Sequence, residues 1–291
     1  MSAAHARAKR SLGQNFLVDP NQQRRIVAAV APGPRTVVLE IGPGRGALTE
    51  QLAAAAGRLV LVELDDALAA DLSARYHDRA NVRVVHANAL AAPLEEFTGQ
   101  ALAELAGAGQ ATPELRVVGN IPYNITSPLI FRLLEPELGP ERIVLMVQKE
   151  VAERIAASPG SSAYGALTVG VRTVAGVERL FHVGRGAFRP VPGVDSAVVR
   201  LVPHEPPLLT AAERRDVRVL TRAAFGRRRK QLQKTLRSAP EFALDRADAV
   251  AVLDRAGVAA EARPETLAPE TFIDLARALR GRERPLGGES R

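Results

Sequence analysis

The chain has 291 residues, 46% of them hydrophobic, which is enough for one large α/β domain and a smaller second one. The absence of cysteine excludes disulfides and thiolate metal sites, and no run of about 18 apolar residues occurs, so we expect a cytoplasmic protein without a signal peptide or membrane span. The formal net charge of +7 is concentrated in residues 214–237, which carry ten Arg or Lys and a single acid.

The first part of the chain alternates between strand and helix patterns. A helix is predicted from Pro20, with Asp19 as its N-cap, because proline suits the first helical turn. The predicted strands are residues 36–41, 59–63, 82–86, 116–119, 143–147 and 196–202, and the predicted helices among them are 47–56, 67–76, 127–134 and 149–155. Residues 97–113 fit a surface helix or a loop. Strands that alternate with helices imply parallel pairing, so the sequence predicts an α/β, doubly wound sheet.

The second part of the chain contains only helix patterns. A proline-rich linker at residues 203–207 precedes predicted helices at 209–226, 227–237, 246–256 and 269–280. We therefore predict a first domain over residues 1–205, a small helical domain over 206–281 and a frayed tail over 282–291. The excess positive charge lies in the helical domain, which indicates a polyanion such as nucleic acid as partner, although a solvated helix face would explain the charge equally well.

A glycine-rich turn follows the first predicted strand. Gly42, Gly44 and Ala47 match the pattern G-x-G-x-x-G/A, and Glu63 ends the second strand 21 residues after Gly42. Glycines let a ligand approach the backbone closely, and a carboxylate at this distance can accept hydrogen bonds from both hydroxyls of a ribose. Nicotinamide and S-adenosylmethionine (SAM) enzymes both fit this pattern, and the additional Gly46 is closer to the SAM-dependent methyltransferases.

The stretch Asn120-Ile121-Pro122-Tyr123 directly follows the predicted strand 116–119. An amino group conjugated to a purine is a poor nucleophile, so an enzyme that methylates it must offer acceptors to its protons. We expect the Asn120 side-chain oxygen and the Pro122 carbonyl to be these acceptors, with proline fixing the backbone. Tyr123 offers a ring on which a base can stack, worth about 1–3 kcal/mol. Ligands bind at strand ends in such sheets, which favours a catalytic role over an ordinary turn.

Several further stretches accompany this motif. They are Gly13–Leu17, Glu40–Gly44, Gln148–Arg154, Ala163–Gly165 and Phe188–Ala197, followed by the helical C-terminal part. Together with Asn120–Asn124, they resemble the small-subunit rRNA adenine N6,N6-dimethyltransferases from about Arg10 to Leu279. The resemblance implies a class I SAM-methyltransferase fold, Rossmann-like, with a small all-helical C-terminal domain. It also implies dimethylation of two adjacent adenosines in the 3′-terminal hairpin loop of 16S rRNA, in a precursor of the small ribosomal subunit.

The same resemblance implies the roles of particular side chains. The implied contacts of the cofactor, SAM, are Asn15, Leu17, Gly42, Gly44, Glu63, Asn88 and Asn120. Phe188 is implied to stack on the flipped adenine opposite Tyr123. We expect a monomer and no metal site.

Position 88 departs from the family pattern, which usually has Asp there. The family Asp accepts a hydrogen bond from the amino group of the cofactor's adenine. Asn88 can still accept through its carbonyl oxygen, but without charge assistance, at a cost of about 1 kcal/mol. We therefore expect weaker SAM binding with activity retained.

Five cations in the predicted helix 227–237 are the candidate RNA contacts. They are Arg227, Arg228, Arg229, Lys230 and Lys234. Arg227, Lys230 and Lys234 would share one helical stripe and contact phosphates without reading sequence. Arg228 and Arg229 are alternatively explained by local packing or pairing.

Three other functions are weighed against this one. A macrolide-resistance methyltransferase of large-subunit rRNA shares the motif, but residues 125–131 and 194–198 are closer to the small-subunit group. A ribosome-assembly factor without catalysis is supported only by Asn88. A nicotinamide oxidoreductase follows from the glycine turn alone and leaves Asn120 to Tyr123 unexplained.

Overall fold

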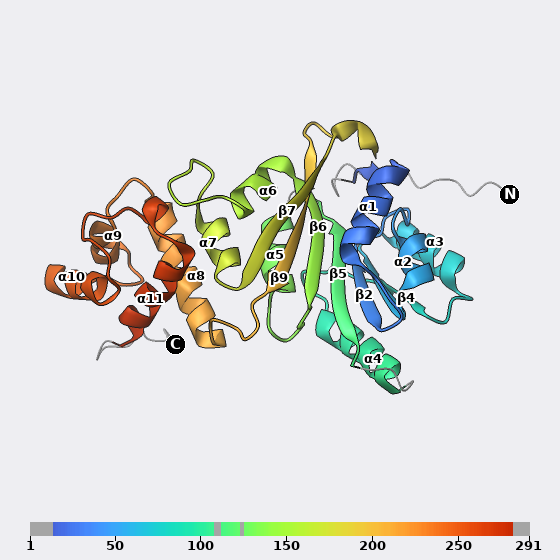
Figure 1. The fold of residues 1–291 in the computed structure, drawn as a ribbon, viewed down its shortest axis with the longest axis horizontal. Helices are drawn as coiled ribbons and strands as arrows, with labels where there is room; N and C mark the ends of the chain where they lie inside the picture. The colour runs from blue at the N-terminus through green and yellow to red at the C-terminus, as the bar shows by residue number, and fades with distance from the viewer. Residues whose placement is uncertain (1–13, 108–111, 123–124, 282–291) are drawn as a thin grey trace. The chain divides into compact units, whose positions relative to one another are not determined.

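The computed structural model describes residues 14–107, 112–122 and 125–281, and the statements below concern these residues (Figure 1). They form two compact units. The first runs to Ala152 and includes Val177–Pro203, and the second contains Glu153–Gly176 and the chain from His204 onward. The sequence analysis placed residues 153–176 in the first domain. The predicted domain bounds, with their division after residue 205, stay a prediction.

The first unit is built on a seven-stranded sheet with the strand order β4-β3-β2-β5-β6-β9-β7. Its strands are β2 (Thr36–Ile41), β3 (Arg58–Glu63), β4 (Val82–His86), β5 (Glu114–Asn120), β6 (Arg142–Gln148), β7 (Ala175–Val183) and β9 (Ser196–Pro203). Strands β2 to β6 pair in parallel, and β9 is antiparallel to β6. The predicted α/β, doubly wound class is confirmed. A separate antiparallel pair joins β1 (Phe16–Leu17) to β8 (Phe188–Arg189).

Helices precede, connect and follow the parallel strands. They are α1 (Pro20–Val30), α2 (Thr49–Ala55), α3 (Asp66–Tyr76), α4 (Leu94–Gly107), α5 (Thr126–Leu133) and α6 (Lys149–Ile155), with a 3-10 turn at Arg185–Ala187. Asp19 caps α1 as predicted, since its side chain accepts hydrogen bonds from the backbone N–H groups of Asn21 and Gln22. The open question over residues 97–113 is answered by α4, which extends to Gly107.

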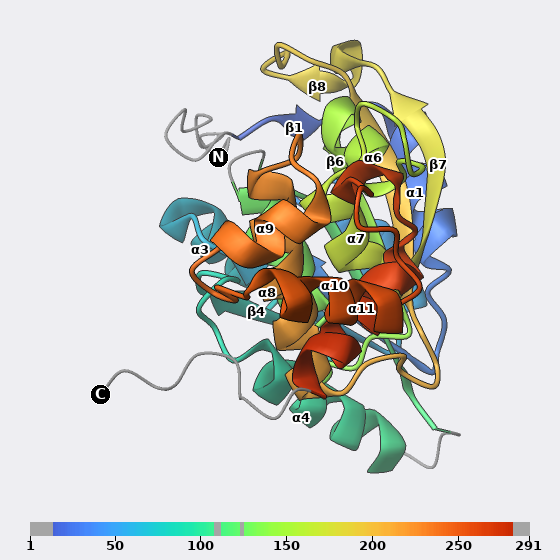
Figure 2. The same cartoon turned by 90° about the vertical axis from the view of Figure 1, so that its left-hand side faces the viewer.

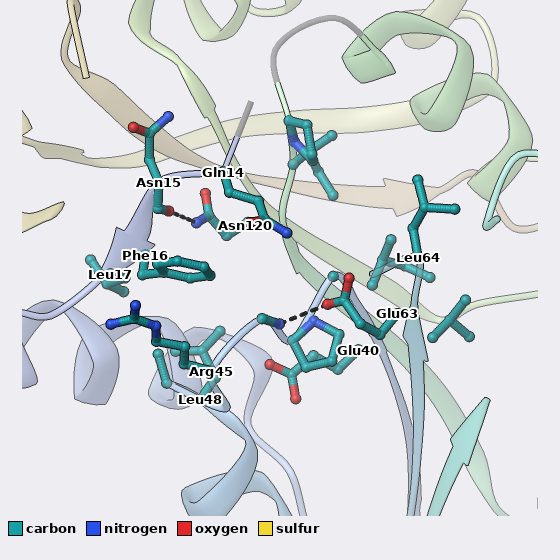
Figure 3. A pocket seen from close by; sticks show the side chains of 18 of the residues that line it. Gln14, Asn15, Phe16, Leu17, Glu40, Arg45, Leu48, Glu63, Leu64 and Asn120 are labelled. Carbon is teal, nitrogen blue, oxygen red and sulfur yellow. Dashed lines mark hydrogen bonds between the residues drawn. The ribbon is translucent and has the colours of Figure 1, made fainter. Parts of the chain in front are cut away.

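The parallel pairing brings the carboxyl ends of β2, β3, β4 and β5 to one edge of the sheet. The glycine turn follows β2, Glu63 ends β3, Asn88 follows β4, and Asn120 ends β5. Residues separated by up to 78 positions in the sequence therefore meet at this edge, where Figure 3 shows a cavity.

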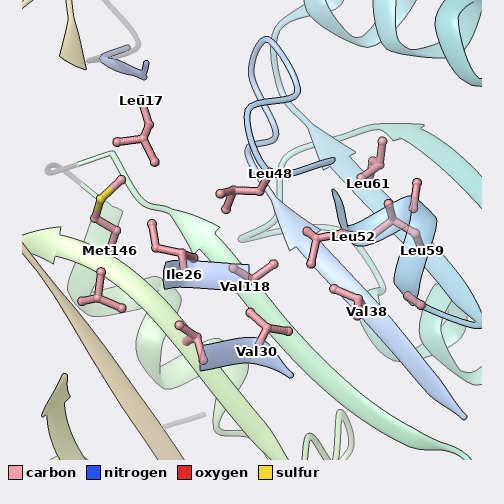
Figure 4. Packing of buried hydrophobic residues seen from close by; sticks show 14 of the residues in the cluster. Leu17, Ile26, Val30, Val38, Leu48, Leu52, Leu59, Leu61, Val118 and Met146 are labelled. Atoms are coloured by element: carbon pink, nitrogen blue, oxygen red, sulfur yellow. The ribbon is translucent and has the colours of Figure 1, made fainter. Parts of the chain in front are cut away.

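Apolar side chains hold α1, α2 and α3 against one face of the sheet (Figure 4). Ile26 and Val30 of α1 and Leu52 of α2 pack with Val38 of β2 and Val118 of β5. Each of them is at most 1% exposed, and burying a side chain of this size contributes about 1.5–3 kcal/mol. The opposite face of β2 is buried as well, and α4, which contacts β2, β3 and β5, covers part of it. This two-sided burial is typical of parallel strands.

The second unit is helical (Figure 2). Its helices are α7 (Ala166–Arg172), α8 (Ala211–Gly226), α9 (Leu232–Ser238), α10 (Arg246–Arg255) and α11 (Pro269–Arg280), with a 3-10 turn at Pro264–Thr266. Thr210 and Glu213 form a capping box at the start of α8. The Phe225 ring lies between the rings of Tyr164 and Phe272, with centroid distances of 5.9 and 5.8 Å. Within the described ranges, none of the helices has the length and apolar character needed to cross a bilayer.

The structure corrects two sequence predictions of secondary structure. Strand β7 was not predicted, because Gly176, Glu178 and Arg179 interrupt its apolar pattern, and an edge strand tolerates such residues. The helix predicted over residues 227–237 is wrong for its first part, since α9 begins only at Leu232. The chain leaves the helical conformation at Arg227 (φ −127°, ψ 38°), so the cation cluster lies mostly in a turn.

Candidate active site

A cavity of about 380 Å³ lies at the carboxyl edge of the sheet (Figure 3). Its volume falls within the range of small-molecule sites, about 300–1,000 Å³. All of the predicted cofactor contacts line it, namely Asn15, Leu17, Gly42, Gly44, Glu63, Asn88 and Asn120. Their convergence on one cavity supports their assignment to a single ligand, which itself stays a prediction.

The glycine turn forms one wall of this cavity. Gly42 and Gly44 have φ angles of +64° and +58°, a backbone region that residues with a Cβ rarely adopt. A Cβ on Gly44 would lie 3.2 Å from two ring carbons of Phe16, so the space above the turn is already filled. The Gly44 N–H donates a hydrogen bond of 2.9 Å to Glu63 Oε2, which ties the turn to the end of β3.

The Glu63 carboxylate is fixed by two backbone donors. Oε2 accepts from Gly44 N–H and Oε1 accepts from Asp65 N–H, each at 2.9 Å. A carboxylate oxygen has two lone pairs, so each oxygen keeps one for a ligand. The side chain therefore has a fixed orientation with one free lone pair on each oxygen, and its role as acceptor for the two hydroxyls of a ribose stays a prediction.

Asn88 lies after β4 and is exposed. Its Oδ1 accepts a hydrogen bond of 3.0 Å from the Leu90 N–H, which forms a local turn. One lone pair of Oδ1 therefore remains for a donor such as the amino group of an adenine. The predicted weakening relative to Asp is compatible with this geometry, because an amide oxygen shared with the backbone is a weak acceptor.

The side-chain amide of Asn120 has a defined orientation. Its Nδ2 donates a hydrogen bond of 2.9 Å to the backbone carbonyl of Asn15 (Figure 3). A carbonyl can only accept, so the nitrogen must face Asn15 and the oxygen must face away from it. Among the described residues, no group donates to this Oδ1. The end of β5 therefore presents a fixed, available acceptor in the cavity wall.

Pro122 lines the cavity, but its carbonyl is not available as predicted. It accepts hydrogen bonds from the Ile125 N–H at 3.2 Å and from Thr126 Oγ1 at 3.1 Å. Both lone pairs are used in starting α5 in this conformation, so a role of this carbonyl as an acceptor for the substrate would require one of these bonds to break, and the role stays a prediction. The preceding carbonyl, of Ile121, accepts no hydrogen bond from any described residue. Tyr123 lies outside the described residues.

Phe188 does not line the cavity. Its ring is 1% exposed and belongs to the apolar cluster that contains Leu17, Met146 and Val198. A base can stack on this ring only if the covering side chains move, because no face of it is open. The stacking role stays a prediction, and in the conformation described Phe188 is a core residue.

The segment before β1 covers the cavity and was only partly anticipated. The Gln14 amide donates to Asp65 at 3.2 Å, and Asn15 holds Asn120. The Arg45 guanidinium lies over the Phe16 ring, 4.4 Å from its centroid. The sequence motif around Asn15 contains Gln14 and Phe16, so the signal for these two was present. Nothing in the sequence pattern indicated Arg45.

Glu40 is a further cavity residue that the sequence analysis named only as part of a motif. Its side chain is buried in β2 and accepts a hydrogen bond of 2.8 Å from Thr49 Oγ1. Burial raises the pKa of Glu40 to about 7, and the hydrogen bond from Thr49 opposes this while the nearby Glu63 adds to it.

The cations of the second unit divide into two kinds. Arg228 donates to the carbonyls of Ser161 and Ser162, at 2.9 and 2.8 Å, and so holds the loop before α7. The other predicted contacts have no ion pair or hydrogen-bonded side-chain partner among the described residues. They are Arg227, Arg229, Lys230 and Lys234, of which the last three are exposed. Arg228 thus makes local contacts of the kind the alternative describes, and its contact with RNA stays a prediction.

Comparison with known proteins gives a consistent result. The chain matches the family described as Ribosomal RNA adenine dimethylase over residues 5–280. It is 39% identical, over 272 residues, to the Ribosomal RNA small subunit methyltransferase A of Anoxybacillus flavithermus, and the match covers 93% of this chain and 90% of the relative. A solved dimethyladenosine transferase from Plasmodium falciparum is similar, with a TM-score of 0.74, 28% identity, and 89% of this chain and 95% of that chain covered. The 23S rRNA methyltransferase ErmE is also similar, with a TM-score of 0.64, 31% identity, and 91% and 99% covered.

Proposed function

The chain belongs to the ribosomal RNA adenine dimethylase family, and on this premise we propose that it dimethylates N6 of two adjacent adenosines near the 3′ end of 16S rRNA. It is a SAM-dependent rRNA methyltransferase. The relatives named Ribosomal RNA small subunit methyltransferase A, which are 38–40% identical over 93–96% of this chain, support the small subunit, in a precursor form, as the partner. We propose that the protein acts as a monomer in the cytoplasm.

The residues present fit SAM in the cavity. The backbone of the glycine turn is open to a ligand at Gly42, which carries no Cβ at its positive φ, whereas the Phe16 ring packs over Gly44. Glu63 offers two lone pairs to ribose hydroxyls, and Asn88 offers one to the amino group of the adenine. When bound, SAM supplies a methyl group on a positively charged sulfonium. The chain's own residues then have to position the amino group of the substrate adenine and accept hydrogen bonds from its N–H groups.

The orientation of Asn120 is the observation that carries the proposal. Its Oδ1 is held toward the cavity by the hydrogen bond from Nδ2 to Asn15, and it accepts one N–H of the N6 amino group. The neighbouring Ile121 carbonyl is the second acceptor, in place of the Pro122 carbonyl, which is already used twice. Two acceptors on the amino protons direct the nitrogen lone pair toward the methyl group and replace a strong base by positioning.

The reaction balances without any further reactant. With SAM bound, the methyl group would pass from sulfur to N6, so that one C–S bond would be exchanged for one C–N bond, and one N6 proton would leave for solvent. The second methylation would repeat these steps on the remaining N6–H. At that stage only one N–H is left to donate a hydrogen bond to the two acceptors. Tyr123, and Phe188 after a movement of its cover, are the proposed stacking partners of the flipped base.

The exposed cations of the second unit supply the affinity for RNA. Arg229, Lys230 and Lys234 lie where α8 gives way to α9, and each phosphate contact adds salt-dependent, sequence-independent binding. Arg227 is a less exposed member of the same group. Specificity for the adenosines then comes from the cavity and from the shape of the hairpin loop.

One assay tests the proposed function. The protein is incubated with labelled SAM and, separately, with unmethylated small subunits, mature large subunits and naked rRNA, and modified adenines are mapped by reverse transcription. Label at two adjacent adenines of 16S rRNA is expected, whereas label in the large subunit, or none, contradicts the proposal. Asn120→Asp removes the N–H that holds the side chain and is expected to lower kcat about 100- to 1,000-fold. Retained SAM binding in this variant, measured by calorimetry, distinguishes lost positioning from a lost cofactor site.

A further inference from the structure

Glu40 is a buried acid in the wall of the cavity (Figure 3). It lies on β2, one residue before its end, and is 2% exposed. Its one hydrogen bond comes from the Thr49 hydroxyl at 2.8 Å, and no cation pairs with it within the described part of the chain. A carboxylate in such surroundings is costly in its charged form unless a positive charge arrives.

The ionisable groups around Glu40 come from several elements. Glu63 on β3 is the acid that raises the pKa of Glu40 by its charge. The charge of Glu40 in turn acts on Tyr76 on α3, whose hydroxyl donates a hydrogen bond to Glu50 on α2. Arg45 in the glycine turn lines the same cavity, with its guanidinium over the Phe16 ring rather than paired with Glu40. The parts of α1 and β5 that line the cavity contribute uncharged amides. The site without cofactor therefore combines two acids, one of which is deeply buried.

The titration of Glu40 falls where these contacts predict. The pKa of Glu40 is raised to about 7. Burial is the main cause, the hydrogen bond from Thr49 opposes it, and the charge of Glu63 adds to it. Near neutral pH the carboxyl group is therefore a mixture of protonated and ionised forms. A positive charge placed close to it favours the ionised form.

On the proposed function, SAM and its product differ in the charge on the sulfur. The end of β2 lies between the ends of β3 and β5, where Glu63 and Asn120 would hold the ribose and the substrate amino group, so the sulfur would lie over the end of β2, which carries Glu40. SAM carries a sulfonium, whereas S-adenosylhomocysteine has a neutral thioether at the same position. We propose, on the basis of the proposed function, that Glu40 is a specificity-determining residue that releases its proton to solvent when SAM binds and retains it when S-adenosylhomocysteine binds. The ionised carboxylate favours the cationic cofactor, and its reprotonation after methyl transfer accompanies release of the product.

Calorimetry measures the proton count directly. SAM and S-adenosylhomocysteine are each titrated into the full-length protein at pH 6.5 in buffers of different ionisation enthalpy. The α-amino group of both ligands also titrates, near pH 8. The contribution of Glu40 to the number of protons released is therefore the difference between wild type and Glu40→Gln. For a group with a pKa of about 7, wild type is expected to release about 0.7 more protons per SAM than E40Q. For S-adenosylhomocysteine, the difference is expected to be close to zero.

The pH dependence of the affinity for SAM is a second test of the proposal. Between pH 6 and pH 8, the affinity of wild type for SAM is expected to rise about tenfold more than that of E40Q. Glu50→Gln is the matched control, because Glu50 is an exposed acid on α2 that does not line the cavity, and it should keep the proton count of wild type. Equal proton counts in wild type and E40Q overturn the proposal and leave the methyltransferase function standing. Failure of wild type to bind SAM at all overturns both.

A second variant covers the case in which E40Q does not fold. Thr49→Val removes the hydroxyl that donates a hydrogen bond to Glu40 and stabilises its ionised form. The pH midpoint of proton release on SAM binding is then expected to move up by about one unit, as the loss of a hydrogen bond to a carboxylate predicts. A midpoint unchanged from wild type contradicts the role of Glu40.

Discussion

Replacement of Gly44 by Ala tests whether the glycine turn and the segment before α1 form one packed unit. Gly44 has a φ of +58°, and an added Cβ would lie 3.2 Å from two ring carbons of Phe16. Phe16 cannot move freely, because β1 pairs with β8 and the ring is 9% exposed. The substitution therefore meets two separate obstacles, an unfavourable backbone conformation and a crowded neighbour.

The two costs are separable by magnitude. A non-glycine residue in the left-handed region costs about 1–2 kcal/mol. Crowding a buried ring that is held by strand pairing costs about 1–3 kcal/mol more. We therefore expect Gly44→Ala to lower the free energy of unfolding by about 2–5 kcal/mol. The smaller entropy of the unfolded chain offsets about 0.4–1 kcal/mol of this.

Gly139→Ala is the matched control for this measurement. Gly139 has the same φ of +58°, but its added Cβ would meet only a backbone oxygen at 3.7 Å, an ordinary contact. Urea unfolding of both variants should give a difference of about 1–3 kcal/mol, which is the crowding term alone. The SAM-induced rise in stability should fall in Gly44→Ala and stay unchanged in Gly139→Ala. Equal destabilisation of the two variants would show that Phe16 does not pack on the turn.

Four further outcomes follow from individual contacts. Asn88→Asp should raise the affinity for SAM about fivefold in calorimetry, because a charged acceptor replaces a neutral one, and an unchanged affinity contradicts the role of position 88. Arg228→Ala should lower the free energy of unfolding by about 1–2 kcal/mol. Arg229→Ala should instead leave stability unchanged and reduce the slope of log Kd for rRNA against log salt by about one, and the reverse assignment would refute the division of these cations. The hydrogen bond from Arg277 lowers the pKa of Glu213 to about 2, so its contribution to stability is present above pH 4.5 and is lost as the pH falls toward 2. Glu213→Gln should remove that part of the acid-unfolding profile, and an unaltered profile would contradict it.

Much of the fold follows from the sequence, because β-branched runs and glycine turns encode parallel strands directly. The ends of β2, β4 and β6 agree with the predicted strands to within one residue. The contacts of Asn120 could not be predicted from the sequence. The partner that orients its side chain lies 105 positions earlier in the chain, and only the three-dimensional structure shows which amide atom remains available.

Two site assignments that stay predictions, those of Pro122 and Arg228, share one feature: residue type gives the capacity to form hydrogen bonds but not how much of it is already used. Pro122 has the correct chemistry for an acceptor, yet both lone pairs of its carbonyl are occupied at the start of α5. Arg228 has the correct charge for a phosphate, yet it donates to two backbone carbonyls. Glu40 shows the opposite case, since among the residues that the structure describes it has one hydrogen bond and no paired cation, which leaves its charged form unsatisfied. In this site, the groups most available to a ligand are those whose bonding capacity the protein itself has left unfilled: the Asn120 oxygen, the Ile121 carbonyl and the Glu40 carboxyl group.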